Sequence, residues 1–217
     1  MMNQLLPLSI NQQEIYIDQR MWTNGSHLNI GAIVIVRGVF NREILNCAMS
    51  KIIDCHPGLR TRVYEVDGKP LQTVTEYQHR DICFIDFSNY ESSEAKAQEY
   101  ISQEFAKPFD FNIDAPLADF KLIKLSDDSH IIYAKYHHVI TDGWGTAIFF
   151  REVIKTYTQI INDGKDSQIP RDWVIQEYIE EEKNIWSRLF SCAIAIIGNN
   201  VFRMFHLRFS LSFNHKD

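Results

Sequence analysis

The stretch Tyr136-His137-His138-Val139-Ile140-Thr141-Asp142-Gly143-Trp144-Gly145 places two histidines, a carboxylate and two glycines between two patterned segments. Residues 129–136 alternate polar and apolar side chains and include β-branched residues, which predicts a strand. Residues 146–161 carry apolar side chains at helical spacing, which predicts a helix packed through one face. Gly143 and Gly145 allow a tight turn between these elements and the close approach of a bulky molecule. The junction is therefore the candidate functional site.

The side chains of this turn suggest proton transfer. Histidine has an unperturbed pKa near neutrality, so His138 at the strand end is the candidate for a group that accepts or donates a proton. His137 precedes it by one residue and is expected to point to the opposite face, so the two rings are not equivalent bases. Asp142 leaves two alternatives open: it orients the imidazole as in a catalytic triad, or it folds back to an arginine as a structural brace.

The histidine pair also has plainer interpretations. A His-His pair at the end of a strand is often purely structural. A zinc site is disfavoured because no cysteine or further histidine lies nearby at a ligand spacing such as HxxxH, so we expect no metal. No serine or cysteine accompanies the histidines in a triad-like local pattern, so we expect no covalent nucleophile.

The run from His137 to Gly143 resembles the HHxxxDG motif of the condensation domains of nonribosomal peptide synthetases and of the wider chloramphenicol acetyltransferase-like superfamily. A second segment strengthens the resemblance, because residues 9–16 are similar to the first condensation-domain motif, a Ser-x-Ala-Gln-x-Arg-hydrophobic-aromatic run. The matching residues are Ser9, Gln12, Ile15 and Tyr16, whereas Asn11 and Glu14 replace the usual alanine and arginine.

Residues 55–64 resemble the second motif of the family, RHxxLRTxF. The matching residues are His56, Leu59, Arg60 and Thr61, whereas Cys55 and Val63 depart from the pattern. In this family the arginine of the Leu-Arg-Thr run is commonly placed against the aspartate of the His-His motif, so the resemblance implies an ion pair between Arg60 and Asp142. A buried carboxylate is tolerable when it is paired and hydrogen-bonded, and an arginine can meet it with two parallel hydrogen bonds.

The resemblance implies an α/β fold, namely a chloramphenicol acetyltransferase-like two-layer sandwich in which a single lobe holds a mixed β-sheet covered by helices. Local patterns supply the elements. They predict a helix capped by Ser9, a strand within 28–38, a helix from Asn41 to about Cys55, a hairpin of 63–66 and 71–74 around Asp67-Gly68, a strand at 83–87, a helix from Ser92 or Ser93 to about Lys107 and a strand at 118–125.

The domain prediction assigns residues 1–165 to the N-terminal lobe of a condensation domain and ends it at a polar link, residues 162–167. Residues 166–217 are predicted to form an acidic helix followed by a divergent apolar and basic tail with no family match. A truncated gene, or a shift into an unrelated reading frame, would explain that tail. Residues 189–197 are too few to span a bilayer, which takes about 20 residues, and we expect neither membrane association nor a secretory signal.

The activity implied by the resemblance is amide-bond formation between a donor acyl or peptidyl thioester and an acceptor aminoacyl thioester. Both substrates would be carried on the phosphopantetheine arms of partner carrier proteins, and no cofactor would be bound by this chain. His138 would be the base or the group that positions the amine, and Gly143 would leave room beside His138. His137 would give packing or hydrogen-bonding support. Arg60 and Trp144 would be structural support. The family's site lies between two lobes, so we expect a second lobe or adjacent synthetase modules as further partners and incomplete catalysis by this chain alone.

Two other classes of protein remain open. One is a single-lobe, coenzyme A-dependent acyltransferase of the chloramphenicol acetyltransferase type, although its catalytic histidine lies near the C-terminus. The other is a non-catalytic remnant or interaction module. The composition, with 217 residues, 45% of them hydrophobic, and a net charge of -6, predicts a real core and argues against nucleic-acid binding. The cysteines show neither CxxC nor a disulfide-like spacing, which favours the reducing cytoplasm, and they are Cys47, Cys55, Cys83 and Cys192.

Overall fold

The computed structural model describes residues 5–22, 25–38, 40–79, 81–111, 115–163 and 210–212. The helices are α1 (Ile10–Met21), α2 (Arg42–Cys55), the short 3-10 helix η1 (Pro57–Arg60), α3 (Ser93–Ala106) and α4 (Gly143–Asp163). The strands are β1 (Leu6–Pro7), β2 (Asn29–Arg37), β3 (Thr61–Val66), β4 (Lys69–Val74), β5 (Cys83–Asp86), β6 (Ala118–Ser126), β7 (Ser129–His137) and β8 (Ser210–Ser212).

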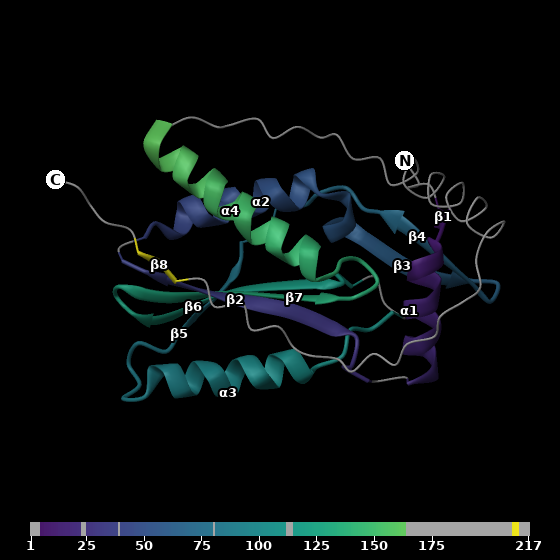
Figure 1. The fold of residues 1–217 in the computed structure, drawn as a ribbon, viewed down its shortest axis with the longest axis horizontal. Helices are drawn as coiled ribbons and strands as arrows, with labels where there is room; N and C mark the ends of the chain where they lie inside the picture. Colours follow the sequence, from purple (N-terminus) through teal and green to yellow (C-terminus); the bar gives the residue numbers. More distant parts are fainter. Residues whose placement is uncertain are drawn as a thin grey trace, which may run out of the picture.

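The central feature is a five-stranded mixed sheet with the strand order β5-β6-β7-β2-β8. β7 runs antiparallel to both of its neighbours, β6 and β2, whereas β5 and β8 lie parallel to the strands they join. Helices α2 and α4 cover one face of the sheet and α3 covers the other (Figure 1). The predicted α/β fold, with a mixed sheet covered by helices, is confirmed, and the structure adds that helices lie on both faces.

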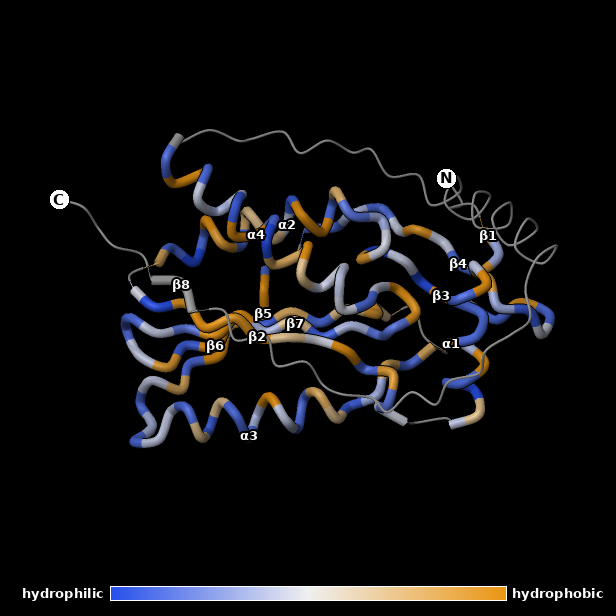
Figure 2. Tube along the Cα trace, viewed as in Figure 1, coloured by the Kyte–Doolittle hydropathy of each residue, from blue (hydrophilic) through white to orange (hydrophobic). Residues whose placement is uncertain are grey.

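Hydrophobic residues concentrate in the strands of the central sheet and recur along the helices (Figure 2). One core joins α2 and α4 to the sheet through Met49, Val153 and Tyr136, and a second joins α3 to its other face through Ile101 and Ile123. A third, smaller core packs the end of β7 against the N-terminal segment, and its members are Leu8, Tyr16, Val63, Leu117 and Val139. Because each fully buried aliphatic side chain contributes about 1.5–3 kcal/mol, this third core ties the candidate turn to α1.

A separate three-stranded sheet has the order β1-β4-β3. Its β3-β4 hairpin turns at Asp67 and Gly68, which both have positive φ angles of 52° and 73°. Two successive positive φ angles are typical of the type I′ turn that the Asp-Gly pair predicts. The hairpin prediction is confirmed, whereas the additional strand β1 and the separation into two sheets were not predicted.

Two of the three predicted caps form, whereas Ser92, at the N-cap of α3, makes no side-chain cap hydrogen bond. The Ser9 side chain accepts from the Gln12 backbone N–H while the Gln12 side chain accepts from the Ser9 backbone N–H, which completes a capping box at the start of α1. Asn41 accepts from the N–H groups of Glu43 and Ile44 at the start of α2.

Helix α4 begins at Gly143, three residues earlier than predicted. The predicted acidic helix and tail of residues 166–217 lie outside the described residues, except for β8, which pairs with β2.

Candidate functional site

The candidate turn is held by backbone hydrogen bonds on both sides of β7. The His137 N–H donates to the Leu117 carbonyl just before β6, at 2.9 Å, and the His138 N–H donates to the Leu28 carbonyl just before β2, also at 2.9 Å. The Ile140 N–H then closes the turn onto the His137 carbonyl at 3.1 Å. The central position of β7 in the sheet therefore fixes the backbone from which both histidine side chains extend.

The His138 ring is half-buried, and its Nδ1 lies 3.0 Å from the Thr141 carbonyl oxygen. A carbonyl oxygen only accepts hydrogen bonds, so Nδ1 carries the proton in the neutral ring and Nε2 keeps its lone pair. Among the described residues, no hydrogen bond engages Nε2. This tautomer is the one that allows His138 to take a proton through Nε2.

His137 is in the opposite situation, because its side chain is 1% exposed. Its Nδ1 accepts from the Val139 N–H at 3.1 Å, which leaves Nε2 protonated and donating to Gln19 Oε1 at 3.1 Å. Burial, and to a smaller extent the neighbouring His138 and His27, lower the pKa of His137 to about 3. The ring therefore stays neutral and holds the turn, as the support role predicts.

Gln19 was not singled out from the sequence, although it completes the setting of His137. Its Nε2 donates to the carbonyls of Trp22 and Gly25 at 3.3 and 3.4 Å, which directs Oε1 toward the histidine. The edge of the Phe111 ring also packs against His137, at a centroid distance of 4.6 Å and an interplanar angle of 90°. A glutamine on a partly buried face of α1 carried no local signal of this contact.

The predicted ion pair between Arg60 and Asp142 is wrong for the residues that the structure describes. Asp142 is exposed and serves as the N-cap of α4: its Oδ1 accepts from the Gly145 N–H at 2.7 Å, and its carbonyl accepts from the Thr146 N–H at 3.0 Å. The first N–H groups of a helix have no partner within the helix and carry partial positive charge, so they attract a carboxylate without an arginine.

Arg60 instead joins two segments, the end of α2 and the end of β4, through three backbone carbonyls. It donates to Ile53 and Asp54 in the last turn of α2, at 3.2 and 2.9 Å, and to Thr75 just after β4. The end of a helix has unpaired carbonyls and partial negative charge, which explains why the guanidinium lies there. Arg60 remains a structural residue, but it supports α2 and β4 and not Asp142.

The small residues of the motif differ in their surroundings. A Cβ placed on Gly143 would contact nothing within 4 Å, so the described chain leaves open space there. A Cβ on Gly145 would lie 2.2 Å from Thr141 Oγ1, so this position requires glycine while Thr141 keeps its rotamer. Trp144, predicted as structural support, is 74% exposed and does not support the turn by packing within the described residues.

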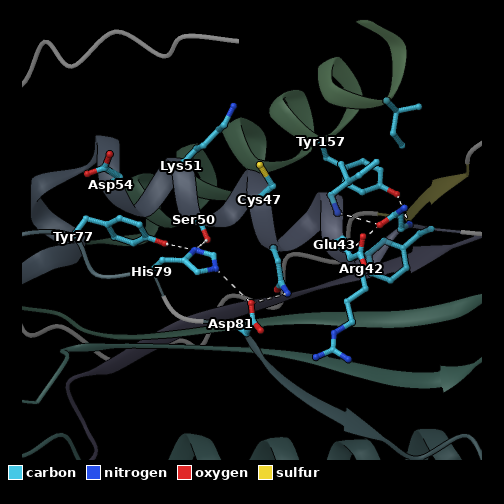
Figure 3. A pocket seen from close by; sticks show the side chains of 15 residues that line it. Arg42, Glu43, Cys47, Ser50, Lys51, Asp54, Tyr77, His79, Asp81 and Tyr157 are labelled. Carbon is cyan, nitrogen blue, oxygen red and sulfur yellow. Dashed lines mark hydrogen bonds and ion pairs between the residues drawn. The ribbon is translucent and has the colours of Figure 1, made fainter. Parts of the chain in front are cut away.

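A large hollow of about 1040 Å³ lies elsewhere, along the outer face of α2, and none of residues 137–144 lines it. Figure 3 shows Ser50, His79 and Asp81 in a row within it. Ser50 Oγ is 3.2 Å from His79 Nδ1, which Tyr77 OH also approaches at 3.4 Å, and His79 Nε2 is 3.6 Å from Asp81. The side chains of His79 and Asp81 are 64% and 73% exposed, so this is a solvated surface cluster without the preorganisation of a triad.

Among the described residues, no group of three or more His, Cys, Asp or Glu side chains is arranged to hold a metal ion. No helix among these residues is long and apolar enough to cross a membrane.

The sequence is similar to segments of large peptide synthases. It is 27% identical over 192 residues to gramicidin S synthase 2 of Aneurinibacillus migulanus, covering 85% of this chain and 4% of that protein. It is 31% identical over 198 residues to tyrocidine synthase 3 of Brevibacillus parabrevis, covering 88% of this chain and 3% of that protein. The chain thus spans a small part of the curated relatives it matches.

The fold is similar to that of solved condensation domains. The starter condensation domain of rhizomide synthetase RzmA superposes with a TM-score of 0.76 at 21% identity, covering 84% of this chain and 44% of that one. The first condensation domain of the calcium-dependent antibiotic synthetase gives a TM-score of 0.75 at 21% identity, covering 85% and 44%. The family model described as the condensation domain matches residues 2–188. Because this match spans most of the chain, the chain belongs to the condensation domain family.

Proposed function

We propose that the chain forms the N-terminal lobe of a nonribosomal peptide synthetase condensation domain, in which His138 acts on the amine of the acceptor substrate. The observation that carries this proposal is the hydrogen bond from His138 Nδ1 to the Thr141 carbonyl, which leaves the Nε2 lone pair at a half-buried surface. His137, neutral and buried, holds the turn and takes no part in proton transfer.

The proposed reaction joins two thioesters carried on the phosphopantetheine arms of carrier proteins. The acceptor nitrogen attacks the donor carbonyl carbon, a C–N bond forms, the C–S bond breaks, and the donor arm leaves as a thiol. Nε2 of His138 removes the proton that the nitrogen loses or orients the amine for attack. Since a thioester is already activated, alignment contributes most, up to about 7–11 kcal/mol, and the base adds about 10²–10⁴-fold.

We further propose that a second lobe completes the site, whether it belongs to the same polypeptide or to another. Solved condensation domains are longer than the matched region, which covers 44% of the chain of the RzmA domain. The space beside Gly143 is open on the described side, which suits a site whose other wall comes from elsewhere. The partners would be carrier proteins and adjacent synthetase modules. A cytoplasmic location is part of the proposal, supported by Cys47, Cys55 and Cys83, which form no disulfide within the described residues.

The test is amide formation from two loaded carrier proteins, with the chain supplied together with a second lobe from a related condensation domain. His138→Ala should lower product formation by about 10²–10⁴-fold, because the base is lost. His79→Ala is the matched control, since it removes an exposed histidine from the large hollow, and it should leave the rate unchanged. Equal rates for wild type and His138→Ala, or no product from the complemented wild type, would overturn the proposal.

A further inference from the structure

Two glutamines from distant segments form a reciprocal amide pair beside the candidate turn. Gln12 lies in the first turn of α1, and Gln72 lies in β4 with 1% of its surface exposed. Gln12 Nε2 donates to Gln72 Oε1 at 3.0 Å, and Gln72 Nε2 donates to Gln12 Oε1 at 2.8 Å. This pairing of two primary amides fixes both planes relative to each other.

The remaining groups of the two amides are also engaged. The second N–H of Gln12 donates to the Val139 carbonyl at 3.1 Å, and its oxygen also accepts from the Ser9 N–H at 2.9 Å. The second N–H of Gln72 donates to the Pro7 carbonyl at 3.0 Å. Turning either amide over would set an oxygen against a carbonyl, so each side chain has one satisfactory orientation. The pair therefore acts as a fixed connector between β1, α1, β4 and the turn.

The connection to Val139 is the functionally informative contact. Val139 lies between His138 and Thr141, and its side chain is 2% exposed within the third core. The hydrogen bond from Gln12 holds the Val139 carbonyl. The peptide group between Val139 and Ile140 therefore cannot rotate freely. The same short segment ends at Thr141, whose carbonyl receives the His138 Nδ1–H.

We propose that Gln12 and Gln72 are positioning residues for His138: their amide pair keeps the turn in the conformation that holds the proton on Nδ1 and the lone pair on Nε2. The importance of this role for catalysis rests on the proposed function of His138. The structural consequence does not, because the tautomer of a histidine can be observed without substrate.

The experiment measures the ¹⁵N chemical shifts of the His138 ring nitrogens in the full chain, in which the neutral ring should be predominantly in the Nδ1–H form. Gln12→Leu removes the donor to Val139 and should move the ring toward the tautomer mixture of an unconstrained imidazole. Gln13→Leu is the matched control: Gln13 lies next along α1 and also donates to a backbone carbonyl, that of Leu8 at 2.8 Å, without touching the turn. This control should keep the wild-type tautomer.

A second variant covers the case in which Gln12→Leu does not fold. Gln12→Glu keeps the oxygen that accepts from Ser9 and Gln72 but replaces the amide nitrogen that donates to Val139, and it should change the tautomer in the same direction. In the complemented assay both variants should lower kcat by up to about 10²-fold with KM little changed, since a misplaced catalytic group lowers the rate of the bound complex.

An unchanged tautomer in folded Gln12→Leu or Gln12→Glu would overturn the positioning role even if His138 proves catalytic. Conversely, a changed tautomer together with full activity of His138→Ala would overturn the proposed function and leave the amide connector intact as a structural finding. The two failures are therefore distinguishable.

Discussion

Replacement of Asp142 separates its two possible roles, because they predict different losses of stability. As the N-cap of α4, the carboxylate accepts one hydrogen bond from the Gly145 N–H and faces the positive end of the helix. Loss of an N-cap side chain costs about 0.5–2 kcal/mol, and the interaction of the charge with the helix dipole is worth about 0.3–1 kcal/mol. We therefore expect Asp142→Ala to lower the free energy of unfolding by about 1–2 kcal/mol.

Asp142→Asn sharpens the distinction. Asparagine is as good an N-cap as aspartate, so this variant keeps the hydrogen bond and loses the charge, and it should cost less than about 1 kcal/mol. A buried ion pair with Arg60 would behave differently, because removal of one partner leaves an uncompensated charge and costs about 3–5 kcal/mol. The two hypotheses therefore differ by more than the uncertainty of a urea titration that follows tryptophan fluorescence.

Arg60→Ala completes a double-mutant cycle with Asp142→Ala. The arginine donates to three half-buried backbone carbonyls, and a hydrogen bond typically contributes about 0.5–1.5 kcal/mol net, so Arg60→Ala should cost about 1.5–4.5 kcal/mol on its own. Since the two side chains share no partner, their effects should add within about 0.5 kcal/mol. A measured coupling energy above about 1.5 kcal/mol would refute the separation of Arg60 from Asp142.

Further predictions concern the histidines and glycines of the motif. The folded pKa of His137 lies near 3, below its unfolded value, so the unfolded chain binds the extra proton and stability should fall as pH drops from about 6.5 toward 3, by up to about 1.4 kcal/mol per pH unit. His137→Asn should flatten that slope in urea titrations at several pH values, and an equal slope would contradict the buried neutral ring. Gly145→Ala should cost about 1 kcal/mol in thermal unfolding, because Thr141 must leave its rotamer. Gly143→Ala should leave stability within about 0.5 kcal/mol yet lower amide formation, and full activity would show that substrate does not use this space. Gln19→Leu leaves the buried Nε2–H of His137 without its acceptor and should lower the free energy of unfolding by about 1–3 kcal/mol in urea titrations, and a loss below about 0.5 kcal/mol would mean that Gln19 does not hold the ring.

The sequence predicts well those features that depend on neighbouring residues. Ser9 and Asn41 cap their helices because a side-chain oxygen reaches N–H groups two or three residues ahead. Asp67-Gly68 fixes the hairpin through its own φ angles. The same local reasoning applies to Asp142, which was assigned to an ion pair although its position just before a helix is typical of an N-cap. That N-cap could therefore have been predicted from the sequence alone.

The contacts that the sequence does not reveal are those between polar side chains and distant carbonyls. Gln12 and Val139 are 127 residues apart, and Gln19 and His137 are 118 apart, so no periodicity or spacing links them. A carbonyl is present at every position, and nothing in the identity of Val139 marks it as an acceptor. The motif comparison identifies Gln12 as a matching residue, but its partner becomes known only from the folded chain.

Segments of the first two motifs also lie against the His-His turn. The first motif supplies Gln12, which holds the Val139 carbonyl, and the second places Gly58 so close to the turn that a Cβ there would lie 3.3 Å from the Ile140 carbonyl oxygen. The Gln12 hydrogen bond is made to the backbone of the His-His turn and constrains its path, while the missing side chain of Gly58 leaves room for the Ile140 carbonyl. A half-buried imidazole has few contacts of its own to fix its direction, and the backbone beneath it must therefore be held from outside. On the positioning role proposed for Gln12, the first motif serves the His138 turn by fixing its backbone, so a change far from His138 in sequence should alter its tautomer.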